Sequence, residues 1–154
     1  TGDQIVIATK SSEPSSAKML STTATGSSLK HTSSMTISDG PIILPENLPS
    51  DAAVFDVEQG ISAGTFALKE INNGYLYGAN DADHTINTLS FKDKKDASAS
   101  WYISIDSKSS AANAYAYYNN TEYRYLNNNF GSKFNFVNVL SKDSYYYIYY
   151  IDGK

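Results

Sequence analysis

The sequence predicts an all-β protein made of three repeats of four short strands, and two observations carry this prediction. Three aromatic-led strand patterns begin at Phe55, Trp101 and Tyr147, at equal intervals of 46 residues. Apolar residues do not recur at helical spacing, whereas short alternating runs bounded by Gly, Asn, Asp and Ser do. A fixed period indicates a repeat architecture. Twelve strands in three groups of four are what a β-trefoil requires: a six-stranded barrel capped by three hairpins. A β-sandwich is the alternative, and it would lack the threefold regularity.

Each repeat presents its four strand patterns in the same order. Asn73-Gly74 is the best local hairpin signal, because both residue types tolerate positive φ. We expect one domain over residues 1–154, with approximate repeats at 1–61, 62–110 and 111–154. The expected strands, first to fourth in each repeat, are Ile5–Ile7, Lys18–Leu20, Met35–Ile37 and Phe55–Val57; Phe66–Leu68, Tyr75–Tyr77, Ile86–Phe91 and Trp101–Ile105; and Tyr115–Tyr117, Tyr123–Leu126, Phe134–Val137 and Tyr147–Ile151.

The first repeat is the least regular of the three. Ser/Thr-rich excursions are expected at Thr9–Ala17 and Thr22–Ser34. The prolines of Pro41–Pro49 exclude a central strand there and predict an extended loop that packs apolar residues inward. Phe55, Trp101 and Tyr147 are predicted to be equivalent core residues near the pseudo-threefold axis.

Composition excludes several classes of function. The chain has 154 residues, a formal charge of −4 and a pI near 5.0, which argues against nucleic acid and anionic membrane surfaces as partners. No apolar run approaches the roughly 20 residues that span a bilayer, so no membrane insertion is expected. The sequence contains no cysteine, which excludes disulfides, thiolate nucleophiles and zinc–thiolate sites. No cofactor is predicted.

Eight strings spread over most of the chain carry a resemblance to a known family. They are Gly2–Ile7, Met19–Ser21, Ser50–Phe55, Gly64–Leu68, Asn73–Ala79, Ala99–Ile105, Tyr123–Asn128 and Tyr147–Tyr149. Together they resemble a recurrent module at the ends of secreted or surface proteins of gut anaerobic bacteria, some of them nuclease- or phosphatase-like. The resemblance implies an extracellular or cell-surface accessory module of a longer protein. Its motifs are structural, and no catalytic residue is carried over from it.

The candidate catalytic and metal-binding residues lack the patterns that their chemistry needs. A Ser-His-Asp triad needs a histidine oriented by a carboxylate and a nucleophile on a sharp turn, and neither His31 nor His84 sits in such a setting. Asn80–His84 offers alternating oxygen ligands for calcium but lacks the glycine and bidentate Glu of an EF-hand, so a polar connection is the preferred interpretation. Asp56 and Glu58 share one strand face, which predicts a solvated surface rather than a glycosidase pair.

The Tyr/Asn-rich segment from Tyr115 to Phe130 is the most promising functional surface. Alternation predicts that Tyr115 and Tyr117 are buried and that Tyr118 points outward. Sugar recognition needs an aromatic face for stacking and planar amides for hydroxyl groups, and this segment supplies both. Arg124, the sole arginine, projects away from its two tyrosine neighbours and offers a fork of donors to an acidic ligand. The candidate ligand-binding residues are Tyr118, Asn119, Asn120, Arg124, Asn127 and Asn129.

These observations predict a non-catalytic binding module, with a glycan as the expected partner. The alternative is a structural or protein-interaction domain that docks against a neighbouring domain of the parent protein. That alternative predicts an exposed apolar patch. An enzymatic role is not expected, because no convergent set of acid, base and nucleophile can be assembled from the sequence.

Overall fold

In a computed structural model of the chain, the residues that the structure describes form thirteen strands and two short 3-10 helices. The structure describes residues 2–9, 16–36, 42–43, 45–80, 87–117, 123–129, 133–138 and 146–151. Among these residues, no helix is long and apolar enough to cross a membrane. The elements are β1 Gln4–Ala8, β2 Ser16–Thr25, β3 Ser28–Thr36, β4 Ile42–Ile43, η1 Pro45–Asn47 and β5 Phe55–Gln59; β6 Phe66–Glu70, β7 Gly74–Asn80, β8 Asn87–Lys92, η2 Ala97–Ala99 and β9 Trp101–Ile105; and β10 Ala112–Tyr117, β11 Tyr123–Asn129, β12 Lys133–Val137 and β13 Tyr147–Ile151.

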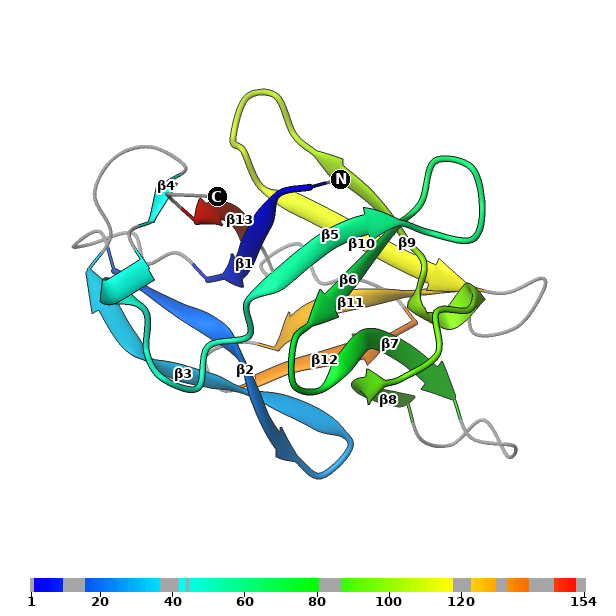
Figure 1. Cartoon of the computed structure of the whole chain (residues 1–154), viewed down its shortest axis with the longest axis horizontal. Helices are drawn as coiled ribbons and strands as arrows, with labels where there is room; N and C mark the ends of the chain where they lie inside the picture. Colours follow the sequence, from blue (N-terminus) through cyan, green and yellow to red (C-terminus); the bar gives the residue numbers. More distant parts are fainter. Residues whose placement is uncertain are drawn as a thin grey trace.

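Six of these strands close into a barrel, in the order β1, β5, β6, β9, β10 and β13. Antiparallel ladders join β1 to β5, β5 to β6, β6 to β9 and β9 to β10. A bridge between Ala112 and Tyr146 links β10 to the start of β13, and β13 pairs with β1 from Tyr147 to Tyr150. The first and last strands therefore lie side by side (Figure 1). Closure leaves the barrel without a free edge.

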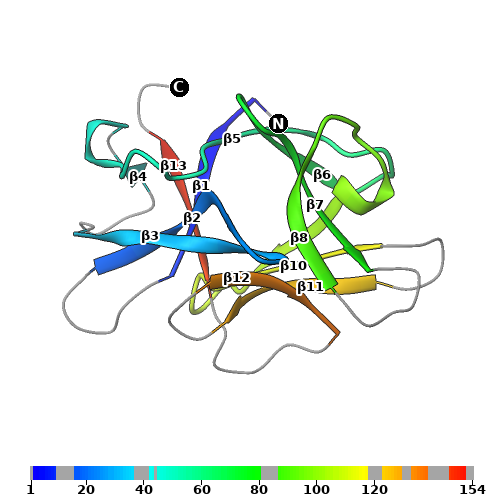
Figure 2. The same cartoon turned by 90° about the horizontal axis from the view of Figure 1, so that it is seen from below.

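Three hairpins, β2–β3, β7–β8 and β11–β12, complete the three repeats. Figure 2 shows the barrel strands β5 and β6 on one side of the molecule and the hairpin strands β11 and β12 on the other. The hairpins contact one another: β12 pairs with β3, and the Leu89 amide donates to the Ser27 carbonyl at 2.9 Å. The fold is a β-trefoil. The predicted architecture is confirmed, and the β-sandwich alternative is not what the chain forms.

In two of the three repeats, the aromatic residue that begins the fourth strand lies at the centre of the core. Phe55 and Trp101 are fully buried in the main core. In the third repeat this place belongs to Tyr146, not to Tyr147 as the 46-residue interval predicts. The pairing register shows why: Ile5 faces Phe55, Phe66 faces Trp101, and Ala112 faces Tyr146. The third repeat is one residue shorter to this point, so the prediction for Tyr147 is wrong by one position.

A second aromatic layer, from the third strands, packs on the first. Phe91 of β8 stacks on Phe55, with ring centroids 6.3 Å apart, and Phe136 of β12 meets Trp101 edge-on at 5.8 Å. The Trp101 indole Nε1 also donates to the Leu76 carbonyl at 2.9 Å. Both ring contacts cross from one repeat to the next, so these rings hold the repeats together.

The first repeat differs from its prediction in the region expected to be a Ser/Thr-rich excursion. Residues 22–34 lie largely in the β2–β3 hairpin, and the expected third strand at Met35 is only the end of β3. Gly26 turns the chain with φ of 60°, a value that suits glycine. Serine and threonine occupy strand positions here because hydrogen bonds satisfy them: the Thr32 hydroxyl, for example, accepts from the Met19 amide at 2.9 Å.

Candidate functional site

The threefold repeat creates three equivalent patches on the outside of the barrel. Each patch contains three residues. The first directly follows the buried aromatic of the fourth strand and points outward, the second pairs with the first on the next barrel strand, and the third pairs with the second on the adjoining hairpin. The three sets differ in chemistry. They are Tyr147, Ala8 and Met19; Asp56, Lys69 and Tyr75; and Tyr102, Tyr115 and Tyr125.

The first patch is covered by the chain itself. Ala8 and Met19 are fully buried, together with Val6, Ala17, Tyr149 and Ile151, in a second apolar cluster separate from the main core. Leu48, Ala52 and Val54, from the segment after η1, pack on this cluster. The prediction that the proline-rich loop brings apolar residues inward is confirmed for Leu48. This patch is therefore part of the packed interior.

The second patch is ionic. The Tyr75 hydroxyl donates to Glu58 at 2.9 Å, Lys95 forms an ion pair with Glu58 at 3.1 Å, and the Lys69 ammonium lies 5.6 Å from the Tyr75 ring centroid. Burial opposes ionisation of Glu58, but the hydrogen bonds from Lys95 and Tyr75 outweigh it and hold the pKa of that carboxyl below its ordinary value. The charges of this patch thus satisfy one another.

The third patch consists of half-buried tyrosines, which we call the tyrosine face: Tyr102 of β9, Tyr115 and Tyr117 of β10, and Tyr125 of β11. Tyr102 and Tyr115 stack with their ring centroids 4.9 Å apart. Tyr117 meets Tyr102 edge-on at 5.9 Å, and Tyr125 meets Tyr115 edge-on at 6.0 Å. Three strands thus hold four rings in one contiguous aromatic surface.

Amide groups continue the tyrosine face along β11 and β12. Asn127 lies two residues beyond Tyr125 and therefore on the same side of the strand, opposite Asn135 in register. The Asn127 Nδ2 donates to the Asn135 Oδ1 at 2.8 Å, whereas the Asn127 Oδ1 is buried and has no hydrogen-bond partner in the described structure. A buried acceptor without a donor is costly. Because Asn127 is buried, the exposed amide that extends the tyrosine face along β11 is that of Asn129.

The structure brings some of the predicted ligand-binding residues to this face and not others. Asn127 lies on it, and Asn129 is exposed farther along the same side of β11. Arg124 pairs with Ala116 in register, so it projects to the opposite side of β11 from Tyr125, as predicted, and does not join the tyrosines. Tyr118, Asn119 and Asn120 lie outside the described residues.

The predicted alternation on β10 is wrong. Ala112, Ala114 and Ala116 are the buried residues, and Tyr115 and Tyr117 point outward. The interior beside β10 already holds the rings of Trp101 and Phe136, so only small side chains fit there. The regular alternation of alanine with tyrosine was the signal for this arrangement, because an outward tyrosine needs no volume in the core.

The remaining candidates have structural partners. The His31 Nε2 is 3.0 Å from the Asn128 Oδ1, and its ring meets Phe134 edge-on at 5.0 Å. His31, in β3, pairs with Leu20 of β2. It thus occupies the place that Phe91 and Phe136 hold in the other repeats. Asp56 accepts from Gln4 at 2.9 Å. Residues 81–84 of the calcium candidate lie outside the described residues. Among the residues that are described, no group of three metal-ligating side chains occurs.

One comparison with known proteins, that with solved structures, supports the fold. No protein-family model matches the chain, and no curated protein does at a significant level. Among solved structures, the chain is similar to one described as "BEL beta-trefoil apo crystal form 3". The two share 13% sequence identity, and the match covers 97% of this chain and 93% of the other with a TM-score of 0.57. At this identity the likeness establishes the β-trefoil fold alone.

Proposed function

We propose that this protein is a non-catalytic carbohydrate-binding module and that the tyrosine face holds the sugar. The observation that carries the proposal is the contrast among three equivalent patches. One patch is covered by the chain's own apolar residues, one is neutralised by an ion pair, and one presents four half-buried tyrosine rings with the exposed amide of Asn129 farther along the same strand side. Only the third is a contiguous aromatic surface on the outside of the barrel.

The chemistry of this face suits a sugar. The apolar side of a pyranose ring packs on a tyrosine ring, while tyrosine hydroxyls and asparagine amides both donate to and accept from sugar hydroxyls. Tyrosine also loses little conformational entropy on binding, because its ring has two rotatable bonds, and the neighbours of Tyr115 already restrict it. The acidic pI of about 5.0 favours a neutral or cationic glycan over a sulfated one.

The same proposal includes the setting of the module. The resemblance to accessory modules of gut anaerobic bacteria supports an extracellular or cell-surface location, as part of a longer protein. A neutral sugar ligand is consistent with that setting, since glycans cover cells and dietary particles outside the bacterium.

A glycan array tests this proposal, with Tyr115→Ala as the diagnostic variant. We expect the parent chain to bind a defined set of glycans and Tyr115→Ala to weaken that binding at least tenfold, because Tyr115 contacts all three other rings of the face. Tyr75→Ala is the matched control, since it removes a tyrosine ring from the second patch, where Tyr75 holds the position that Tyr125 holds in the tyrosine face. Silence of the parent chain across plant, mucin and bacterial glycans, or equal losses in both variants, would contradict the proposal.

The alternative function, docking against a neighbouring domain, calls for a continuous exposed apolar patch. The large apolar side chains most exposed in the described structure are Ile61, Ile71, Ile105 and Tyr150. Ile105 and Tyr150 lie together at one end of the barrel, while Ile61 and Ile71 lie in separate turns. The docking hypothesis predicts that the parent protein's adjacent domain raises the melting temperature of this one.

A further inference from the structure

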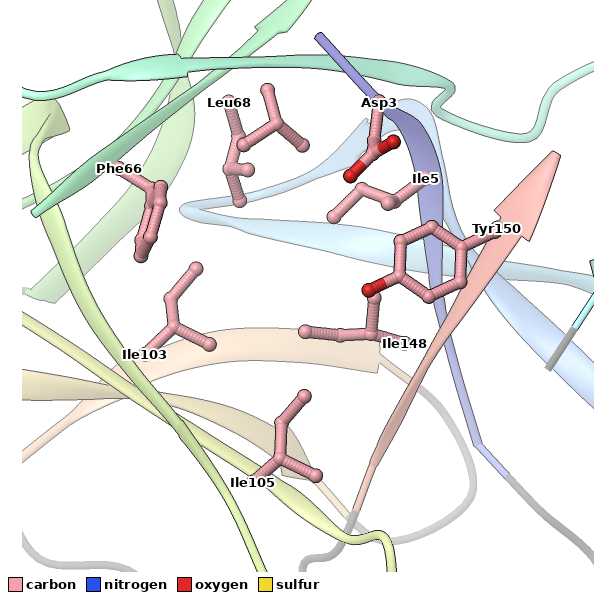
Figure 3. A pocket seen from close by; sticks show the side chains of 9 residues that line it. Asp3, Ile5, Phe66, Leu68, Ile103, Ile105, Ile148 and Tyr150 are labelled. Atoms are coloured by element: carbon pink, nitrogen blue, oxygen red, sulfur yellow. The ribbon is translucent and has the colours of Figure 1, made fainter. Parts of the chain in front are cut away.

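A hollow of about 380 Å³ opens at the end of the barrel where Asp3 and Tyr150 lie, among residues from five of the six barrel strands. It is separate from the tyrosine face, with which it shares no residue. Its walls are aliphatic and aromatic (Figure 3). The lining residues are Asp3, Ile5, Val57, Phe66, Leu68, Ile103, Ile105, Ile148 and Tyr150.

The three repeats differ in side-chain volume at this level of the barrel. Ile5 and Phe66 occupy equivalent positions in the first two repeats, each opposite a buried aromatic of the fourth strand, and both line the hollow. The third repeat has the smaller Ala112 at that position, and β10, which carries it, contributes no residue to the lining. Protein interiors are close-packed, so a hollow of this size is a distinct feature of the barrel.

Two polar groups mark the rim of the hollow. Figure 3 shows the Asp3 carboxylate and the Tyr150 hydroxyl both turned toward the space that the aliphatic side chains enclose. The Asp3 side chain is exposed and has no hydrogen bond or ion pair within the described part of the chain. A negative charge at the mouth of an apolar pocket is complementary to a cationic head on an apolar body.

We propose that this hollow binds a small amphiphile that carries a protonated amine on a hydrocarbon chain. The chain lies among Ile103, Ile148 and Leu68, and the ammonium group meets Asp3 and Tyr150. The size agrees with a short ligand, since small-molecule pockets run from about 300 Å³ upward and this one is near that limit.

Three probes with the same chain length test the proposal: octylamine, octanoate and octanol, titrated into the isotope-labelled protein and followed by methyl NMR. We expect all three to shift the methyl signals of Ile103 and Ile148. Octylamine should bind roughly fivefold more tightly than octanoate at low salt, which is the size of effect that one exposed charge supplies, and added salt should reduce the ratio.

Variants separate the charge from the apolar walls. Asp3→Asn should bring the octylamine-to-octanoate ratio to about one and leave octanol binding unchanged. Asp93→Asn removes the same charge from an exposed position outside the hollow and should leave the ratio as it was. Ile105→Ser should weaken all three probes, and since Ile105 is 54% exposed the variant should still fold. The proposal is overturned if Asp3→Asn does not change the octylamine-to-octanoate affinity ratio, or if the probes leave the methyl signals of Ile103 and Ile148 unshifted.

Discussion

Adding one methyl group at Gly78 should destabilise the protein by forcing apart two neighbouring repeats. A Cβ at Gly78 would lie 2.3 to 2.5 Å from three ring carbons of Phe136, whereas carbon atoms in contact stand about 3.5 Å apart or more. The ring must therefore move by roughly 1 Å. It is 1% exposed and packed edge-on against Trp101, so it has no free space to enter.

Overpacking of this kind costs about 1–3 kcal/mol, and the lower backbone entropy of alanine in the unfolded chain returns about 0.4–1 kcal/mol. Taken from the middle of each range, the net loss for Gly78→Ala is then about 1 kcal/mol, or a melting temperature lower by roughly 2–4 °C for a chain of this size. Urea denaturation followed by tryptophan fluorescence measures it, because Trp101, the one tryptophan, lies beside the affected ring.

A double-mutant cycle tests the cause. Phe136→Leu removes the ring that the new methyl group strikes, so Gly78→Ala should cost less in that background, by 0.5 kcal/mol or more. Stability of Gly78→Ala equal to that of the parent, or strictly additive losses in the double variant, would refute the explanation.

Three further outcomes are expected. Trp101→Phe should lose about 2–4 kcal/mol in urea denaturation, because it leaves a cavity and removes the donor to the Leu76 carbonyl. Burial opposes ionisation of Asp96, but the hydrogen bonds to its carboxylate, above all that from Lys92, hold its pKa below the ordinary value of 3.8. Ionised Asp96 therefore stabilises the folded chain above pH 3.8, and this stabilisation is lost as the pH falls through the lowered pKa. Asp96→Asn should therefore lessen the fall in melting temperature on acidification below pH 4, and an unchanged acid profile would count against this. Ile71→Ser, at an 81% exposed turn position, should change stability by less than about 0.5 kcal/mol in the same urea assay.

Much of the fold could be predicted because period and alternation are properties of the chain itself. The interval between Phe55 and Trp101 marks two equivalent buried strands, and nearly every expected strand of the second and third repeats lies within an observed one. The failure at Tyr147 has a simple cause: consecutive tyrosines at 145–147 satisfy the pattern in more than one register, and only pairing with Ala112 selects Tyr146.

The candidate site was harder to predict, because recognising it requires a comparison of the side chains at equivalent barrel positions in all three repeats. Tyr115 is a good buried strand residue by type, and its outward direction follows only from the volume that Trp101 and Phe136 take inside. Likewise, the local sequence does not show that Lys69 and Tyr115 occupy equivalent positions in two patches. That correspondence becomes visible once the barrel register is known.

The pairing of β1 with β13 has a consequence for how the chain acquires its structure. Ile5 faces Tyr150 across the ladder, so almost the entire chain must be synthesised before the first strand has both neighbours. Contacts of such long sequence separation slow folding, which places this protein among the slower β proteins, at milliseconds to seconds. Until then β1 presents an apolar run, Ile5–Ala8, with one edge unpaired. At this stage the incompletely folded chain is most prone to aggregate with other copies.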